Sequence, residues 1–97
     1  MIVHVVMFKF KDENKASNIQ KVQAELNALV AKIPALKSME AGVNFSKENR
    51  AFDLFLYTTF DTKEDLKTYA VHEKHLKVIE LIKKVTIESK VVDYIKN

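Results

Sequence analysis

The sequence predicts an α+β fold of the ferredoxin-like type, a β-α-β-β-α-β sandwich with helices on one face of a four-stranded antiparallel sheet. Three observations predict it. Strand-like and helix-like segments follow one another in that order. The 97 residues make one domain, residues 1–97, and contain one Gly and one Pro, too few for a linker. Finally, the first and third strand-like segments are apolar on both faces, so helices on one face leave the other uncovered.

The first half of the chain predicts a strand, a turn and a helix. The strand is expected at Ile2–Phe10, which is rich in β-branched and aromatic residues and has no breaker. A polar turn follows, in which Asp12 and Asn14 are candidate helix caps. Apolar residues then recur at helical spacing over Ile19–Ile33. Pro34 is expected to end this helix, because it lacks a backbone donor and restricts the residue before it.

The second half predicts three further strands and two helices. The strand over Lys37–Phe45 alternates between apolar and polar residues, as expected for a strand at a sheet edge. Asp61 or Thr62 can cap the first of the two helices, with Glu64 or Asp65 completing a capping box. The other elements are expected as a third strand, a short helix that ends near Tyr69, a longer helix and a last strand: Phe52–Phe60, the segment up to Tyr69, His72–Lys84 and Thr86–Ile95.

The uncovered face of the sheet predicts self-association. Whichever face the helices leave uncovered carries large apolar residues of the first and third strands, because neither face is polar. The first strand has His4, Val6, Phe8 and Phe10 on one face and Val3, Val5 and Met7 on the other. Burying one Leu- or Phe-sized side chain contributes roughly 1.5–3 kcal/mol, so a row of them in water marks an interface. We therefore expect a homodimer whose two sheets form a dimeric α+β barrel around a small cavity. We also expect His4 to point to this second face, so that the pairing surface lines the cavity.

Composition excludes several classes of partner. The formal charge is +3 with a single Arg, and the lysines alternate with acidic residues, which indicates a solvated surface and no nucleic-acid partner. Cysteine is absent, which excludes disulfides and thiolate metal ligands and fits the reducing, cytoplasmic compartment. The apolar start of the chain is too short for a membrane span, so no membrane partner is expected. The lone Gly excludes a glycine-rich phosphate loop, and no cofactor is expected.

The histidines allow three interpretations. His72 and His75 lie three residues apart at a helix start and point roughly the same way, with Tyr69 nearby. As metal ligands they lack a third partner, because the zinc-protease pattern needs a histidine where Leu76 stands, so no metal is expected. A histidine of near-neutral pKa beside a Tyr hydroxyl suffices for proton transfer at a carbonyl compound. The alternative is that Tyr69 and His75 only pad the rim of the barrel. His4 either hydrogen-bonds inside the cavity or is a satisfied core histidine.

The chain as a whole resembles the stress-responsive A/B-barrel domain family, called Dabb. The resemblance is carried in order by the opening run Met1–Lys11, the helix end, the central hairpin, the second helical region and the closing strand: Ile33-Pro34, Gly42-Val43-Asn44-Phe45-Ser46, Phe52-Asp53-Leu54, Phe60, Leu66, Tyr69, His72, His75 and Val92-Asp93-Tyr94. It implies a dimeric α+β barrel and a family that includes plant stress-associated proteins and many bacterial proteins of undefined role.

The resemblance also implies site residues. A plant polyketide cyclase that shares the fold uses a Tyr and a His, which match Tyr69 and His75 here, and His4 matches a further histidine of its cleft. This chain has Leu54 where that cyclase has a histidine in its third strand. Some plant members of the family hold a cation through backbone carbonyls near the end of the first helix, here around three residues: Val30, Ile33 and Leu36.

Three functions remain open from the sequence. The first is a binding module that holds a small hydrophobic molecule in a cleft lined by His4, His72, Phe8 and Leu54. The second is a cofactor-independent cyclase, lyase or isomerase in which His75 is the general base and Tyr69 orients a carbonyl or enolate oxygen. The third is a purely structural oligomer. Open space between the Tyr and the His residues would favour the first two, and side chains filling that space would favour the third.

Overall fold

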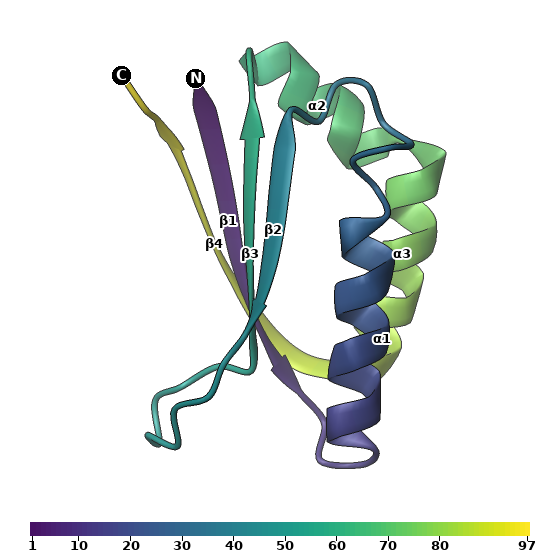
Figure 1. The fold of residues 1–97 in the computed structure, drawn as a ribbon, viewed down its shortest axis with the longest axis vertical. Helices are drawn as coiled ribbons and strands as arrows, with labels where there is room; N and C mark the ends of the chain where they lie inside the picture. The colour runs from purple at the N-terminus through teal and green to yellow at the C-terminus, as the bar shows by residue number, and fades with distance from the viewer.

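A computed structural model describes all residues, 1–97, and its elements follow the predicted order, including the two helices between the third and the last strand. Figure 1 shows the strands and helices in two layers. The elements and their bounds are β1 (Ile2–Phe10), α1 (Lys15–Asn27), β2 (Ser38–Val43), β3 (Leu54–Phe60), α2 (Lys63–Val71), α3 (Glu73–Val85) and β4 (Thr86–Ile95).

The four strands form one antiparallel sheet in the order β2-β3-β1-β4. This is the predicted ferredoxin-like arrangement, and β2 lies at an edge as its alternating pattern indicated. All three helices lie on one side of the sheet, with α2 at the end where both termini are found (Figure 1). The two central strands pair over Ile2↔Phe60 to Phe8↔Leu54, and β4 pairs with β1 along its whole length.

The core lies between the helices and the facing side of the sheet. Alternation along β1 directs Ile2, His4, Val6, Phe8 and Phe10 to this side. Sixteen buried apolar residues form the cluster, and those that the helices contribute include Ile19, Val22, Leu26, Tyr69, Val78 and Ile82. The Gln23 side-chain amide also donates to the Ala41 carbonyl oxygen at 2.8 Å, which ties α1 to the edge strand.

The opposite face of the sheet carries the predicted second row of apolar side chains. Val5 lies opposite Tyr57 and Val92, and Met7 lies opposite Phe55. The large apolar side chains left in water on this face are Met7, Phe55, Val92 and Tyr94. No helix covers them.

The expectation for His4 was wrong. His4 lies on the same face of β1 as Phe8, which is 5% exposed in the core, and it faces the helices. A strand places alternate side chains on opposite faces, so residues separated by an even number of positions share a face. The surface predicted for pairing therefore does not contain His4.

Helix α1 ends earlier than expected. It stops at Asn27, and turns tightened by i→i+3 hydrogen bonds continue to Pro34, with the Leu29 N–H donating to the Leu26 carbonyl at 2.9 Å. Leu29 and Ile33 are still buried, which explains why the apolar spacing extends past the helix. The apolar pattern reports burial and does not distinguish an α-helix from successive turns.

The predicted caps are confirmed in part. Thr62 is the N-cap of α2, and its hydroxyl accepts a hydrogen bond from the Asp65 N–H at 3.1 Å. Asn14 occupies the N-cap position of α1 in a left-handed conformation, with φ 52°, but its side chain makes no capping bond. Asn tolerates this conformation better than most residues. Asn14 therefore allows the backbone to turn before α1, and its side chain does not cap the helix.

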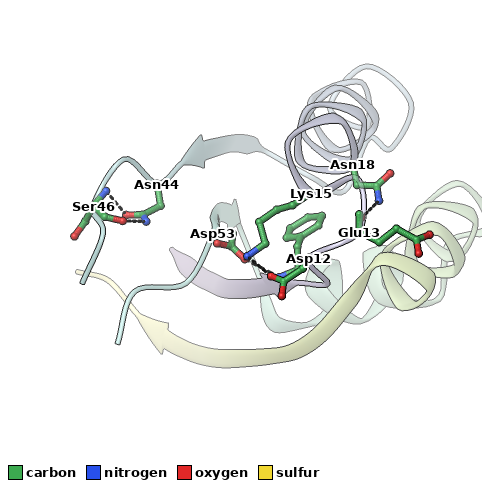
Figure 2. Close-up of polar contacts among 8 residues, drawn as sticks. Asp12, Glu13, Lys15, Asn18, Asn44, Ser46 and Asp53 are labelled. Atoms are coloured by element: carbon green, nitrogen blue, oxygen red, sulfur yellow. Dashed lines mark hydrogen bonds and ion pairs between the residues drawn. The ribbon is translucent and has the colours of Figure 1, made fainter. Parts of the chain in front are cut away.

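The end of the sheet farthest from the termini is fastened by one carboxylate. The Asp53 Oδ2 atom accepts the Phe10 N–H at 2.7 Å and lies 3.9 Å from the Lys15 Nζ atom, which is 3.3 Å from Asp12 Oδ1 (Figure 2). In the adjoining loop, Asn44 and Ser46 are joined by two side-chain-to-backbone hydrogen bonds.

Candidate functional site

A cavity of about 230 Å³ lies inside the single chain, between the sheet and the helices. Its floor comes from β1, β3 and β4 and its walls from all three helices. The lining residues are His4, Val6, Phe8, Leu26, Leu56, Tyr69, His75, Ile79, Ile82, Ser89 and Val91. The sequence-predicted residues Tyr69, His75, His4 and Phe8 are thus brought together around open space.

Tyr69 is the most informative of these residues. Its side chain is 1% exposed and packs against Phe60 and His75, with ring centroids 5.2 and 4.2 Å away. Its hydroxyl is buried and has no hydrogen-bond partner in the protein. Burial raises the pKa of Tyr69 well above its ordinary value, so the phenol stays protonated. A buried hydroxyl without a partner costs about 1–3 kcal/mol, which a hydrogen-bonding ligand atom would offset.

His75 stands beside Tyr69 with one nitrogen already engaged. Its Nδ1 atom lies 3.1 Å from the Ala70 carbonyl oxygen, which can only accept, so Nδ1 carries the hydrogen. Burial is the main cause that lowers the pKa of His75. The neighbouring His4 and His72 add to this lowering, and the Ala70 carbonyl opposes it. At neutral pH the ring is therefore uncharged, and Nε2 is a basic nitrogen.

His4 is oriented by a residue that the sequence reasoning missed. Its Nδ1 atom is hydrogen-bonded to the Asp93 carboxylate, directly across the β1–β4 pair. A carboxylate can only accept, so the His4 Nδ1 atom carries a hydrogen and the orientation of the ring is fixed. Asp93 interrupts a run of apolar residues in the last strand, and that interruption was the available signal. Its partner could not be read from the sequence, because the β1–β4 register was unknown.

Two predicted binding residues lie elsewhere. His72 is the N-cap of α3, where its Nδ1 accepts the Lys74 N–H at 3.1 Å, and it does not line the cavity. Leu54 is 1% exposed in the core and lies toward the other end of β3. Both contribute to the fold around the site, and their predicted binding roles stay predictions.

The described side chains form no group of three or more His, Cys, Asp or Glu residues that could hold a metal ion. Near the end of α1, the Ile33 carbonyl oxygen accepts the Leu36 N–H at 3.0 Å. The backbone-bound cation around these residues stays a prediction. None of the helices has the length and apolar character that crossing a membrane requires.

Comparisons with known proteins place this geometry in context. The model of the Dabb family, described as the stress responsive A/B barrel domain, matches residues 2–96. A stress-response A/B barrel domain-containing protein of Arabidopsis thaliana is 31% identical over 80 residues, which are 82% of this chain and 30% of that protein. The chain thus spans less than a third of the length of this curated relative.

Solved structures share the fold. A dimeric protein of unknown function with a ferredoxin-like fold from Bacteroides fragilis NCTC 9343 is 29% identical, with a TM-score of 0.88 over 96% of this chain and 93% of that chain. A hydroxynitrile lyase from Passiflora edulis is 21% identical, with a TM-score of 0.87 over 99% of this chain and 93% of that chain. At that identity the second likeness shows the fold alone.

Proposed function

This chain belongs to the stress-responsive A/B-barrel domain family, and from this premise we propose that it forms a homodimer and binds a small hydrophobic molecule in the cavity between sheet and helices. The ligand carries an oxygen atom that accepts a hydrogen bond from Tyr69. The buried, unpartnered Tyr69 hydroxyl is the observation that carries this proposal. The dimeric state of the similar Bacteroides fragilis protein supports the self-association.

The volume of the cavity limits the size of the ligand. An apolar cavity of about 150 Å³ holds benzene. The 230 Å³ found here therefore fit one substituted ring or a short aliphatic chain. Most of the lining is aliphatic or aromatic, and the polar groups are chiefly a phenol and two imidazoles. An aryl or alkyl ketone matches this lining, because its carbonyl can accept from Tyr69 while its body contacts the apolar walls.

Binding of propiophenone and of propylbenzene, which lacks the carbonyl, tests the proposal. We expect the wild type to bind propiophenone roughly tenfold more tightly, the effect of one buried hydrogen bond. Tyr69→Phe should abolish this preference while retaining the fold. Titration followed by two-dimensional NMR measures both dissociation constants.

Tyr57→Phe is the matched control, because it removes a hydroxyl from the opposite face of the sheet and should leave the preference intact. An unchanged preference in Tyr69→Phe, or no binding of either compound, would show the proposal to be wrong.

The state of His75 favours a second function, proton transfer at the carbon next to the ligand carbonyl. The neutral ring has a basic Nε2 and shares the cavity with the Tyr69 phenol. In this reaction His75 Nε2 takes the α-proton, the electron pair becomes the enolate π bond, and Tyr69 donates to the enolate oxygen. Return of the proton to another position, or bond formation or cleavage at the enolate carbon, gives isomerase, cyclase or lyase chemistry without a cofactor.

Exchange of the α-hydrogens of propiophenone for deuterium in D₂O tests this function without knowledge of the natural substrate. We expect His75→Gln to lower the exchange rate by about 10²–10⁴-fold, the usual contribution of a general base, whereas His72→Gln should not. The base is the neutral ring, and its pKa is lowered, so the wild-type rate should fall only when the pH drops below the ordinary histidine value of about 6.5. NMR measures the rates, and exchange that survives His75→Gln would exclude this base.

A further inference from the structure

The cavity has a second compartment that neither the sequence nor the comparisons assign. A cleft of about 520 Å³ opens at the end of the sheet where α2 and both termini lie (Figure 1). It is lined by Ile2, Lys63, Leu66, Lys67, Asp93, Tyr94 and Ile95.

The register of β1 and β4 places this cleft next to the cavity. On the helix-facing side, the cross-strand pairs run in order from the cleft inward: Ile2↔Ile95, His4↔Asp93, Val6↔Val91 and Phe8↔Ser89. The first pair lines the cleft and the last two line the cavity. The pair between them is shared, because Asp93 lines the cleft and His4 lines the cavity. The two compartments therefore lie end to end along the β1–β4 pair, as one groove with the His4–Asp93 pair where they meet.

The floor of this groove is open, and it is apolar on both sides of the His4–Asp93 pair. Val91 is 58% exposed and Ile95 is 60% exposed, although both lie on the side of the sheet that carries the helices. The groove follows β1 from Ile2 to Phe8, which corresponds to about 20 Å of strand. An elongated molecule can therefore lie along it, with one end in the cavity beside Tyr69.

The open end of the groove is basic. Lys63 and Lys67 lie one helical turn apart on α2 and line the same cleft. Lys63 has no carboxylate within salt-bridge distance. Lys67 has only the exposed Glu64, with Nζ 3.6 Å from Oε1. Asp93, the one acidic residue of the cleft, is bound to His4. Two lysines therefore stand against one carboxylate among the residues that line the cleft, so the charge of the lining side chains is positive.

From this groove we propose that the ligand is an elongated amphipathic anion, an aryl or alkyl ketone with a terminal carboxylate. The ketone end occupies the cavity and the carboxylate lies between Lys63 and Lys67. The inference rests on the proposed function, because the ketone is held as described there. Each cross-strand pair along one face adds about 7 Å, so roughly four methylene groups bridge the His4–Asp93 pair.

The test compares 6-oxo-6-phenylhexanoate with its primary amide, which has the same phenyl ketone and chain but no charge. We expect the acid to bind about fivefold more tightly, as two exposed ion pairs allow, and the difference to shrink at high salt. Lys63→Gln/Lys67→Gln should remove the difference and leave the affinity of the amide unchanged. Lys32→Gln/Lys77→Gln is the matched control, since it removes two charges from a separate groove beside α1 and α3, and it should retain the difference.

The outcomes separate this inference from the proposed function. Equal binding of acid and amide, with propiophenone still dependent on Tyr69, would overturn the anionic ligand and leave the proposed function standing. A difference that survives Lys63→Gln/Lys67→Gln would overturn the role of these lysines. Failure of propiophenone, acid and amide alike to bind would overturn both proposals.

Discussion

At the scale of single residues, Asp53 shows how much one side chain can hold together. Its own N–H donates to the Phe8 carbonyl at 2.8 Å, and its carboxylate accepts the N–H of Phe10. Phe10 is 1% exposed, so this N–H lies in the protein interior. Asp53 therefore fastens the end of β1 to the start of β3, and the ion pair with Lys15 at 3.9 Å adds little.

Replacing this carboxylate should lower the stability measurably. We expect Asp53→Ala to lower the free energy of unfolding by about 1–3 kcal/mol, because it leaves the Phe10 N–H without an acceptor. Asp53→Asn keeps an acceptor oxygen and should recover most of the loss. Asp12→Ala breaks only an exposed ion pair and should stay within about 0.5 kcal/mol of the wild type. Urea denaturation measures all three, and a fully stable Asp53→Ala protein would contradict this role.

The residues of the candidate site were predictable to different degrees. Tyr69 and His75 could be placed near each other from the sequence, because only six positions separate them, although they lie on the two helices α2 and α3. Asp93 could not be assigned to His4, since 89 positions separate them and only the strand register joins them. The unpartnered state of the Tyr69 hydroxyl also depends on packing around it, which no local pattern reports.

At the scale of elements, a sequence pattern predicted the bounds of a helix or strand correctly where only one structure could produce that pattern. β4 begins and ends at the predicted residues, Thr86 and Ile95, and Thr62 caps α2 through its hydroxyl. The end of α1 could not be predicted, because Leu29 and Ile33 are buried whether they lie in a helix or in turns. The face to which His4 points was also missed, because both faces of β1 are apolar and offer no contrast.

At the scale of the whole molecule, the two faces of the sheet have different roles. Its helix-covered face contains the cavity, which one chain builds alone. Its open face exposes Met7, Phe55, Val92 and Tyr94, which the proposed dimer buries. The site and the interface are therefore on opposite sides of one layer, contrary to the expectation that pairing and cavity share a surface.

This separation predicts that the dimer can be broken without loss of the site. We expect the 11.2 kDa chain to scatter light as a dimer at micromolar concentration and Phe55→Glu to scatter as a monomer that still binds propiophenone. Leu76→Glu is the matched control, because Leu76 is 48% exposed against 43% for Phe55 but lies on α3. A wild-type monomer, or loss of ligand binding together with the dimer, would contradict this arrangement.

The alternation of β1 carries a consequence for how the chain tolerates insertions. His4 and Val6 face the cavity while Val5 and Met7 face the opposite way, and each is fixed by its partner on both neighbouring strands. One residue inserted before His4 that shifted the pairing by one position would exchange these sets and put imidazole where the subunits meet. The strand thus couples two surfaces on opposite sides of the sheet, and we expect its length to be far less adjustable than that of the loop between β2 and β3.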